Sequence, residues 1–248
     1  MELKEFFTAN PKAAVAFSGG VDSAYLLWAA IDAGAQVKAY YIKTAFQPEF
    51  ELEDAKRLAE EIGAELEILP LDILCRPEVT ANPADRCYHC KKALFTRLVQ
   101  AAAADGFTLL LDGTNASDDA SDRPGMRALR ELSVRSPLRE CGLTKDEIRR
   151  RSKEAGLFTH DKPAYACLAT RIPTGAAITA EKLHRTEQSE GFLVSLGLRD
   201  FRVRSHENTA RLQVTAEDLP KVLQNREIIL AELKKYYYTV LLDLEVRP

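Results

Sequence analysis

Hydrophobic and polar residues in the first half of the chain follow two alternating patterns. Short apolar runs rich in strand-forming residues are separated by longer segments, in which apolar residues recur every three or four positions and a glycine ends the run. The short runs predict strands, and the longer periodic segments predict helices. The expected strands are 13–17, 37–43, 65–72 and 108–115, and the expected helices are 23–34, 48–63 and 88–106.

The alternation of strands and helices predicts the fold class. Strands that follow one another through a helix lie parallel, and their crossovers are right-handed. We therefore expect an α/β fold, a doubly wound parallel sheet, over residues 1–174.

The pattern changes beyond that point. One long helix is followed by two short strands with a polar turn between them, then by another helix and a final strand. This order predicts a small C-terminal α+β domain over residues 175–248. The expected helices are 179–197 and 217–236, and the expected strands are 201–205, 210–214 and 239–246.

Composition narrows the class of protein. The 248 residues are 46% hydrophobic and 29% charged, with a net charge of −3 and five cysteines. An apolar run of roughly 18 residues, long enough to cross a membrane, does not occur, and the first residues do not resemble a secretory signal. We expect a cytoplasmic protein with neither a membrane nor a nucleic acid as partner, because the net charge favours no polyanion. In a reducing compartment the cysteines are core residues, metal ligands or catalytic thiols.

The turn between the first strand and the first helix carries the strongest chemical signal, "SGGVDS" at 18–23. Gly19 and Gly20 allow backbone N–H groups to converge on an anion, and Ser18 and Ser23 add hydroxyl donors. The start of a helix adds partial positive charge, so a phosphate chain fits this turn. Asp22 would repel phosphate alone but could hold Mg²⁺ on it. The alternative is an ordinary turn capped by serine.

This turn lacks the lysine of a Walker A loop and the spacing of a dinucleotide-binding turn. It resembles the PP-loop of the ATP pyrophosphatase superfamily, whose members adenylate an oxygen of their substrate and release pyrophosphate. Three further residues are expected near the bound ATP. Gly113 lies in "DGTN" after the fourth strand, Lys43 ends the second strand, and Arg171 could clamp a phosphate or a carboxylate. A plain turn and a solvated strand end are the alternatives for Gly113 and Lys43.

Three cysteines form a candidate site for a metal or for sulfur. Cys87 and Cys90 make a C-x-x-C pair at the start of a helix, where the dipole lowers thiol pKa values, and Cys167 lies in "CLATRIPTG". Three thiolates could hold a [4Fe–4S] cluster or zinc, or act as a redox pair with a third nucleophile. Cys75 and Cys141 are expected to be small buried residues.

The chain resembles the LarE family of ATP-dependent sulfur transferases in "AFSGGVDS", "NPADRCYHCK", "LLDGTNASDD", "RPGMRALRELSVRSPL", "CLATRIPTG" and "ARLQV". The resemblance implies that ATP and Mg²⁺ activate a carboxylate of pyridinium-3,5-biscarboxylic acid mononucleotide, which becomes a thiocarboxylate. It implies Asp22 and Cys167 as catalytic residues, and a homo-oligomer. With Cys87, Cys90 and Cys167 present, the chain resembles the members with a [4Fe–4S] cluster. Other members consume one cysteine, here Cys167, as the sulfur donor.

Three arginines alternate along the two short C-terminal strands. Arg202, Arg204 and Arg211 could share one face of the sheet and bind the phosphate of the substrate. A solvated sheet face is the alternative. Two other functions stay open: a tRNA-thiolating PP-loop enzyme, which would need a basic surface, and a non-enzymatic carrier of a nucleotide or an iron–sulfur cluster.

Overall fold

The computed structural model describes residues 2–118 and 124–247. The chain divides into two compact units. The first comprises Met1–Ile73 and Asp85–Tyr165, and the second comprises Leu74–Ala84 and Ala166–Pro248. The second unit therefore also takes a short segment from the first half of the chain. The expected division after residue 174 stays a prediction.

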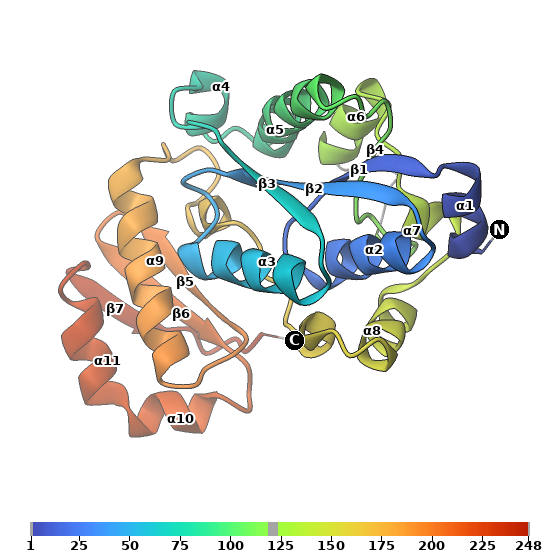
Figure 1. Ribbon diagram of the computed structural model, residues 1–248. Helices are drawn as coiled ribbons and strands as arrows, with labels where there is room; N and C mark the ends of the chain where they lie inside the picture. The colour runs from blue at the N-terminus through green and yellow to red at the C-terminus, as the bar shows by residue number, and fades with distance from the viewer. Residues whose placement is uncertain (1, 119–123, 248) are drawn as a thin grey trace. The chain divides into compact units, whose positions relative to one another are not determined.

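The first unit is built on a four-stranded parallel sheet in the order β3-β2-β1-β4 (Figure 1). This confirms the predicted α/β class. Its strands are β1 (Lys12–Ala16), β2 (Gln36–Lys43), β3 (Glu65–Pro70) and β4 (Leu110–Leu111). The strand expected at 108–115 is shorter than predicted, because only Leu110 and Leu111 pair with β1, whereas the Asp112 N–H donates to the Arg135 carbonyl at 2.9 Å.

Helices cover both faces of this sheet. Ala13 and Val15 of β1 face one hydrophobic cluster with α1, α2, α3 and α8, whereas Ala14 faces a second cluster with α5. Alternation of this kind follows from the period of two along a strand. The helices are α1 (Leu3–Ala9), α2 (Val21–Asp32), α3 (Glu49–Glu61), α5 (Arg86–Ala104), α6 (Pro124–Glu131), α7 (Pro137–Glu140) and α8 (Lys145–Glu154), with the 3₁₀ turn η1 (Phe158–Asp161).

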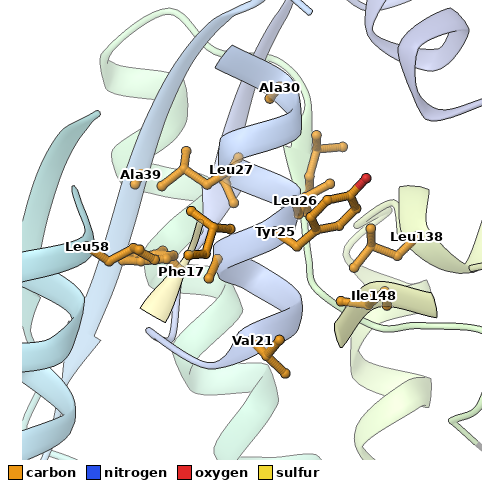
Figure 2. Close-up of a cluster of buried hydrophobic side chains, with 14 of the residues drawn as sticks. Phe17, Val21, Tyr25, Leu26, Leu27, Ala30, Ala39, Leu58, Leu138 and Ile148 are labelled. Atoms are coloured by element: carbon orange, nitrogen blue, oxygen red, sulfur yellow. The ribbon is translucent and has the colours of Figure 1, made fainter. Parts of the chain in front are cut away.

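Helix α2 lies at the centre of the larger cluster (Figure 2). Its residues Leu26 and Leu27 are fully buried, and Leu138 and Ile148 pack on the same cluster from α7 and α8. Burying a leucine side chain stabilises the fold by about 1.5–3 kcal/mol. The packing therefore fixes α2, and with it the turn that precedes α2, at the carboxyl end of β1.

The second unit has a three-stranded sheet in the order β5-β6-β7. The pair β5 (Phe201–His206) and β6 (Thr209–Val214) is antiparallel, as expected for a hairpin, and β7 (Thr239–Leu242) pairs parallel to β6. The prediction of a single helix at 217–236 is wrong. It is two helices that meet at Asn225, α10 (Leu219–Gln224) and α11 (Arg226–Leu233). The unit also contains α4 (Pro77–Thr80), η2 (Leu168–Arg171) and α9 (Ala180–Ser195).

Asn82 attaches the short segment 74–84 to the rest of the second unit. Its side-chain amide donates to the Pro173 carbonyl at 2.7 Å, and its own carbonyl accepts from Gly175 N at 2.8 Å. Across the described parts of both units, each helix is too short or too polar to pass through a lipid bilayer.

Candidate functional site

The turn Ser18–Ser23 joins β1 to α2 at the carboxyl end of the parallel sheet. Gly19 has a φ of +71°, the left-handed region that glycine adopts at little cost. Ser23 Oγ accepts from Ser18 N at 3.2 Å and lies 3.1 Å from Ser18 Oγ, so the turn is closed by its own hydroxyl groups. Gly20 precedes the helix and has no side chain to cap it. The first N–H groups of α2 therefore point into an anion-binding position.

Gly113 brings a second segment against this turn. A Cβ atom built on Gly113 would lie 2.9 Å from Ser23 N, so a larger residue would displace the backbone. The segment "DGTN" thus packs directly on the start of α2, as its place after β4 predicted. Asp112 fixes the segment, because Ser136 and Thr114 donate to its carboxylate at 2.5 Å each.

Asp22 lies in the first turn of α2, facing two donors from distant parts of the unit. Lys145 Nζ is 2.6 Å from Asp22 Oδ2, and Asn115 Nδ2 is 3.4 Å from Asp22 Oδ1. Lys145 begins α8, which Thr144 caps. A carboxylate beside converging N–H groups fits Mg²⁺ carried on phosphates, because magnesium binds oxygen ligands and is often shared between a carboxylate and a phosphate chain.

Two more lysines lie near the carboxyl end of the sheet. Lys43 ends β2, where its ammonium donates to the Gln47 carbonyl at 2.8 Å and pairs with Glu49 at 2.9 Å. Lys162 pairs with Asp54 of α3 at 2.6 Å and lies 3.5 Å from the Gly19 carbonyl. Three lysines of the first unit are thus each paired with a carboxylate in this region.

The C-x-x-C pair occupies the first turn of α5. The Cys87 side chain is exposed and Cys90 is half-buried, and Arg86 Nη2 lies 3.6 Å from Cys87 Sγ. Two thiols one helical turn apart are a suitable donor set for a soft metal or a cluster. Cys167 belongs to the second unit, and within the described ranges no three histidine, cysteine or acidic side chains gather closely enough to hold a metal ion.

None of the five cysteines forms a disulfide. The expectation that Cys75 is buried is wrong, because its side chain is exposed. Cys141 is half-buried against the larger cluster of the first unit, and burial raises the pKa of its thiol.

Cys167 lies at the start of the 3₁₀ turn η2, on a segment fixed by a buried arginine. Arg171 pairs with Glu190 of α9 through Nε and Nη2, at 2.8 and 3.0 Å, and its Nη1 donates to the Ala166 carbonyl at 2.7 Å. Glu190 in turn accepts from Val203 N of β5 at 2.9 Å. The Arg171 guanidinium is therefore positioned to hold the backbone around Cys167, while its expected contact with ATP or a carboxylate stays a prediction.

The three arginines of the hairpin share one face, as predicted, because the register places Arg204 directly opposite Arg211 and Arg202 two positions along the same strand. Burial lowers the pKa of Arg202 to about 10, and Arg171 and Arg247 add repulsion in the same direction. Burial and Arg171 also lower the pKa of Arg204. Two carboxylates of the same unit partly offset this repulsion, since Asp200 lies 3.4 Å from Arg202 Nη1 and Asp243 lies 3.4 Å from Arg211 Nε.

Lys145, Lys162 and Asp54 were not identified from the sequence. Each reaches the turn from an element far along the chain, and none lies in a local pattern typical of phosphate binding. The capping threonine before Lys145 marks the start of a helix but gives no indication of what the lysine contacts.

A turn with converging N–H groups, the Gly113 segment packed on it and the carboxylate of Asp22 lie together at one edge of a parallel sheet, an arrangement suited to a PP-loop enzyme that uses ATP. Known proteins agree with this class. The model of the family described as "Queuosine biosynthesis protein QueC" matches residues 12–86. A tRNA-specific 2-thiouridylase MnmA of Thermotoga petrophila is 28% identical over 61% of this chain and 54% of its own length.

Two other relatives extend over more of the chain. The pyridinium-3,5-bisthiocarboxylic acid mononucleotide synthase of Lactiplantibacillus plantarum is 34% identical over 81% of this chain and 73% of its own length. An uncharacterized protein of Synechocystis, slr1717, is 39% identical over 98% of this chain and 92% of its own length. The chain belongs to the pyridinium-3,5-bisthiocarboxylic acid mononucleotide synthase family, LarE, a family of PP-loop sulfur transferases.

Proposed function

We propose that this enzyme adenylates a carboxylate of pyridinium-3,5-biscarboxylic acid mononucleotide with ATP and converts it to a thiocarboxylate, a step toward the nickel-pincer nucleotide cofactor. The observation that carries the proposal is the 34% identity to the bisthiocarboxylic acid mononucleotide synthase, which extends over 81% of the chain.

The residues of the turn have defined roles in this proposal. The N–H groups after Gly19 and Gly20 bind the phosphate chain, and Asp22 holds the magnesium ion beside it. Bound magnesium neutralises charge on the leaving pyrophosphate. Adenylation is needed because a carboxylate is a poor electrophile, and the site must exclude water so that the acyl adenylate is not hydrolysed. Lys43 and Gly113 complete the nucleotide site.

Incubation of the purified protein with ATP, Mg²⁺ and the biscarboxylic acid mononucleotide tests the function. We expect AMP, pyrophosphate and a product heavier by the mass difference between one sulfur and one oxygen atom. Pyrophosphate release that does not depend on the added acid would contradict the substrate assignment. A salt-sensitive shift of bulk tRNA in a gel, with thiolated tRNA as product, would instead favour a tRNA-thiolating enzyme, the activity named for the MnmA relatives.

For the sulfur source, we propose that the thiolates of Cys87, Cys90 and Cys167 hold a [4Fe–4S] cluster. Such a cluster supplies the transferred sulfur when it is bound. The C-x-x-C pair at the start of α5 supports this proposal, because the alternative in which Cys167 alone is consumed assigns no role to Cys87 and Cys90.

Alanine variants of the three cysteines separate these two sources. With a cluster, each variant prepared without oxygen loses visible absorption and sulfur transfer but still releases pyrophosphate. With a consumed cysteine, Cys87→Ala and Cys90→Ala still complete one turnover, which leaves Cys167 lighter by the mass of hydrogen sulfide. Multiple turnovers by Cys87→Ala would exclude the cluster.

The arginine face of the hairpin is the proposed site for the phosphate of the substrate. Arg204 lies directly opposite Arg211, and Arg211, although it lies 3.4 Å from Asp243 Oδ2, is 54% exposed and can meet a ligand. Replacing Arg211 with methionine should therefore raise KM for the mononucleotide more than KM for ATP. Equal changes in both would indicate a structural role.

A further inference from the structure

Lys162 lies next to the turn Ser18–Ser23, although most of the sequence of the first unit separates the two. Its ammonium is 3.5 Å from the Gly19 carbonyl and 2.6 Å from Asp54 Oδ2, and its side chain is 15% exposed. Gly19 and α3 are themselves in contact, because a Cβ atom on Gly19 would lie 3.1 Å from Ala55 Cβ. Asp54 and Lys162 therefore flank the first glycine of the turn.

The segment that carries Lys162 is fixed on both sides. Arg149 of α8 donates to the Lys162 carbonyl at 2.8 Å and to the His160 carbonyl at 2.6 Å. Tyr165, three residues further on, packs edge to face on Phe50 of α3, with ring centroids 5.1 Å apart. The backbone is thus held while the long side chain can change its partner.

We propose that Lys162 binds the phosphate chain of ATP and that Asp54 occupies its ammonium when no phosphate is present. The inference rests on the ATP site of the proposed function but not on its acid substrate or its sulfur source. A half-buried ammonium next to converging N–H groups adds full positive charge where the turn supplies only partial charge. Asp54, 32% exposed, can return to solvent when phosphate replaces it.

This exchange has an unusual consequence for mutagenesis, because the two partners of one ion pair have opposite effects. Lys162→Met removes a charge-assisted contact and should weaken binding of Mg²⁺–pyrophosphate and Mg²⁺–ATP about ten- to a hundredfold. Asp54→Asn removes the competitor while keeping the shape, and should tighten pyrophosphate binding by about threefold or more. Binding of adenosine, which has no phosphate, should change in neither variant.

Lys38→Met is a matched control. Lys38 is 14% exposed and pairs with Asp105 at 2.6 Å in the same unit, but it lies near the amino end of β2, away from the turn. Calorimetric titration of the intact protein with each ligand gives the three affinities, and circular dichroism verifies folding. Lys38→Met should bind pyrophosphate like the unmodified protein.

Two results would overturn the inference: pyrophosphate affinity of Lys162→Met equal to that of the Lys38→Met control, or binding by Asp54→Asn that is unchanged or weaker. If Lys162→Met does not fold, Asp54→Asn decides alone, since tighter binding supports the exchange and unchanged binding contradicts it. If the inference about Lys162 is wrong, the protein can still form the thiocarboxylate. If the proposed function is wrong, the affinities for pyrophosphate and ATP can still be measured and compared.

Discussion

Lysine–carboxylate pairs occur at both ends of the parallel sheet, but their surroundings differ. At the amino end, Lys38 meets Asp105, Glu67 and Glu65 at 2.6, 2.8 and 3.1 Å, and the Tyr40 hydroxyl also donates to Asp105. The hydrogen bond to Asp105 is the main cause that raises the Lys38 pKa well above its usual range. Its donors are saturated by acceptors of the same unit.

At the carboxyl end, each lysine has one nearby carboxylate and lies beside a turn with converging N–H groups. Lys145 meets Asp22, and Lys162 meets Asp54, each at 2.6 Å. The same residue types thus form a closed structural network at one end of the sheet and exchangeable pairs at the other. The N–O distance is the same in both kinds of pair, so it does not distinguish a structural ion pair from a functional one. The number of acceptors around the ammonium does distinguish them.

The largest expected effect comes from Asp22→Ala. Losing the carboxylate that we propose as the magnesium ligand should lower pyrophosphate release about a thousandfold, because metal charge stabilisation contributes several kcal/mol to the transition state. Thermal unfolding should stay close to that of the unmodified protein, since Lys145 is 30% exposed and can be solvated. Asp105→Ala is the control at the other end of the sheet. Normal pyrophosphate release by Asp22→Ala would contradict the assignment of the turn.

Gly113→Ala should have an intermediate effect. The added methyl group meets the backbone at Ser23 N, so the start of α2 must shift and the affinity for Mg²⁺–ATP should fall about tenfold. Gly191→Ala in α9 is the matched control, because open space surrounds its Cβ position and alanine favours a helix. Equal ATP affinities of the two variants, measured by calorimetric titration, would show that the contact at Ser23 is not needed.

Lys38→Met should have the smallest effect, a loss in the free energy of unfolding on the order of 1 kcal/mol, because solvent screens its partly exposed partners. Denaturant titration measures this loss. Affinity for Mg²⁺–ATP should not change. A drop in ATP affinity would mean that the network at the amino end also shapes the nucleotide site.

The stability difference between Lys38→Met and the unmodified protein should depend on pH. The Asp105 pKa lies below its ordinary 3.8, mainly because of the hydrogen bond from Lys38, so this stabilisation is present above pH 3.8 and is lost as the pH falls further. The Lys38 pKa is raised, so its stabilisation is complete below the ordinary lysine value of 10.5 and declines only above it. Denaturant titrations should therefore give a constant difference between the two proteins from about pH 5 to 9, which shrinks in acid.

Much of the fold follows from the sequence because local pattern and burial agree. The predicted bounds of β1, β2 and α3 differ from the observed ones by one or two residues. The prediction of one helix at 217–236 was wrong, because the helical spacing of apolar residues continues across Asn225 although the chain forms two helices that meet there. Helices α1 and α8 were missed, because a short segment and a highly charged one show little apolar period.

The candidate site was predictable only where one turn carries its own chemistry. "SGGVDS" has paired glycines, hydroxyls and a carboxylate within six consecutive residues, and the structure gives it the expected place between β1 and α2. Arg171 shows the opposite case. Its buried ion pair with Glu190 could not be predicted, because nothing in the local sequence connects the two residues, and its expected ligand contact stays a prediction.

Strand β4 has a consequence for the order in which the molecule folds. It adds only Leu110 and Leu111 to the sheet, and its partners are Ala14 and Val15 near the beginning of the chain. Contacts between residues so far apart close a long loop and therefore form late. Gly113 and Asn115 follow β4. The glycine turn can therefore form with β1, β2 and β3 before the segment that packs on it, which contains Gly113 and Asn115, is in place. The ability to recognise a nucleotide should thus appear abruptly, after most helical signal has been gained, in a stopped-flow refolding experiment.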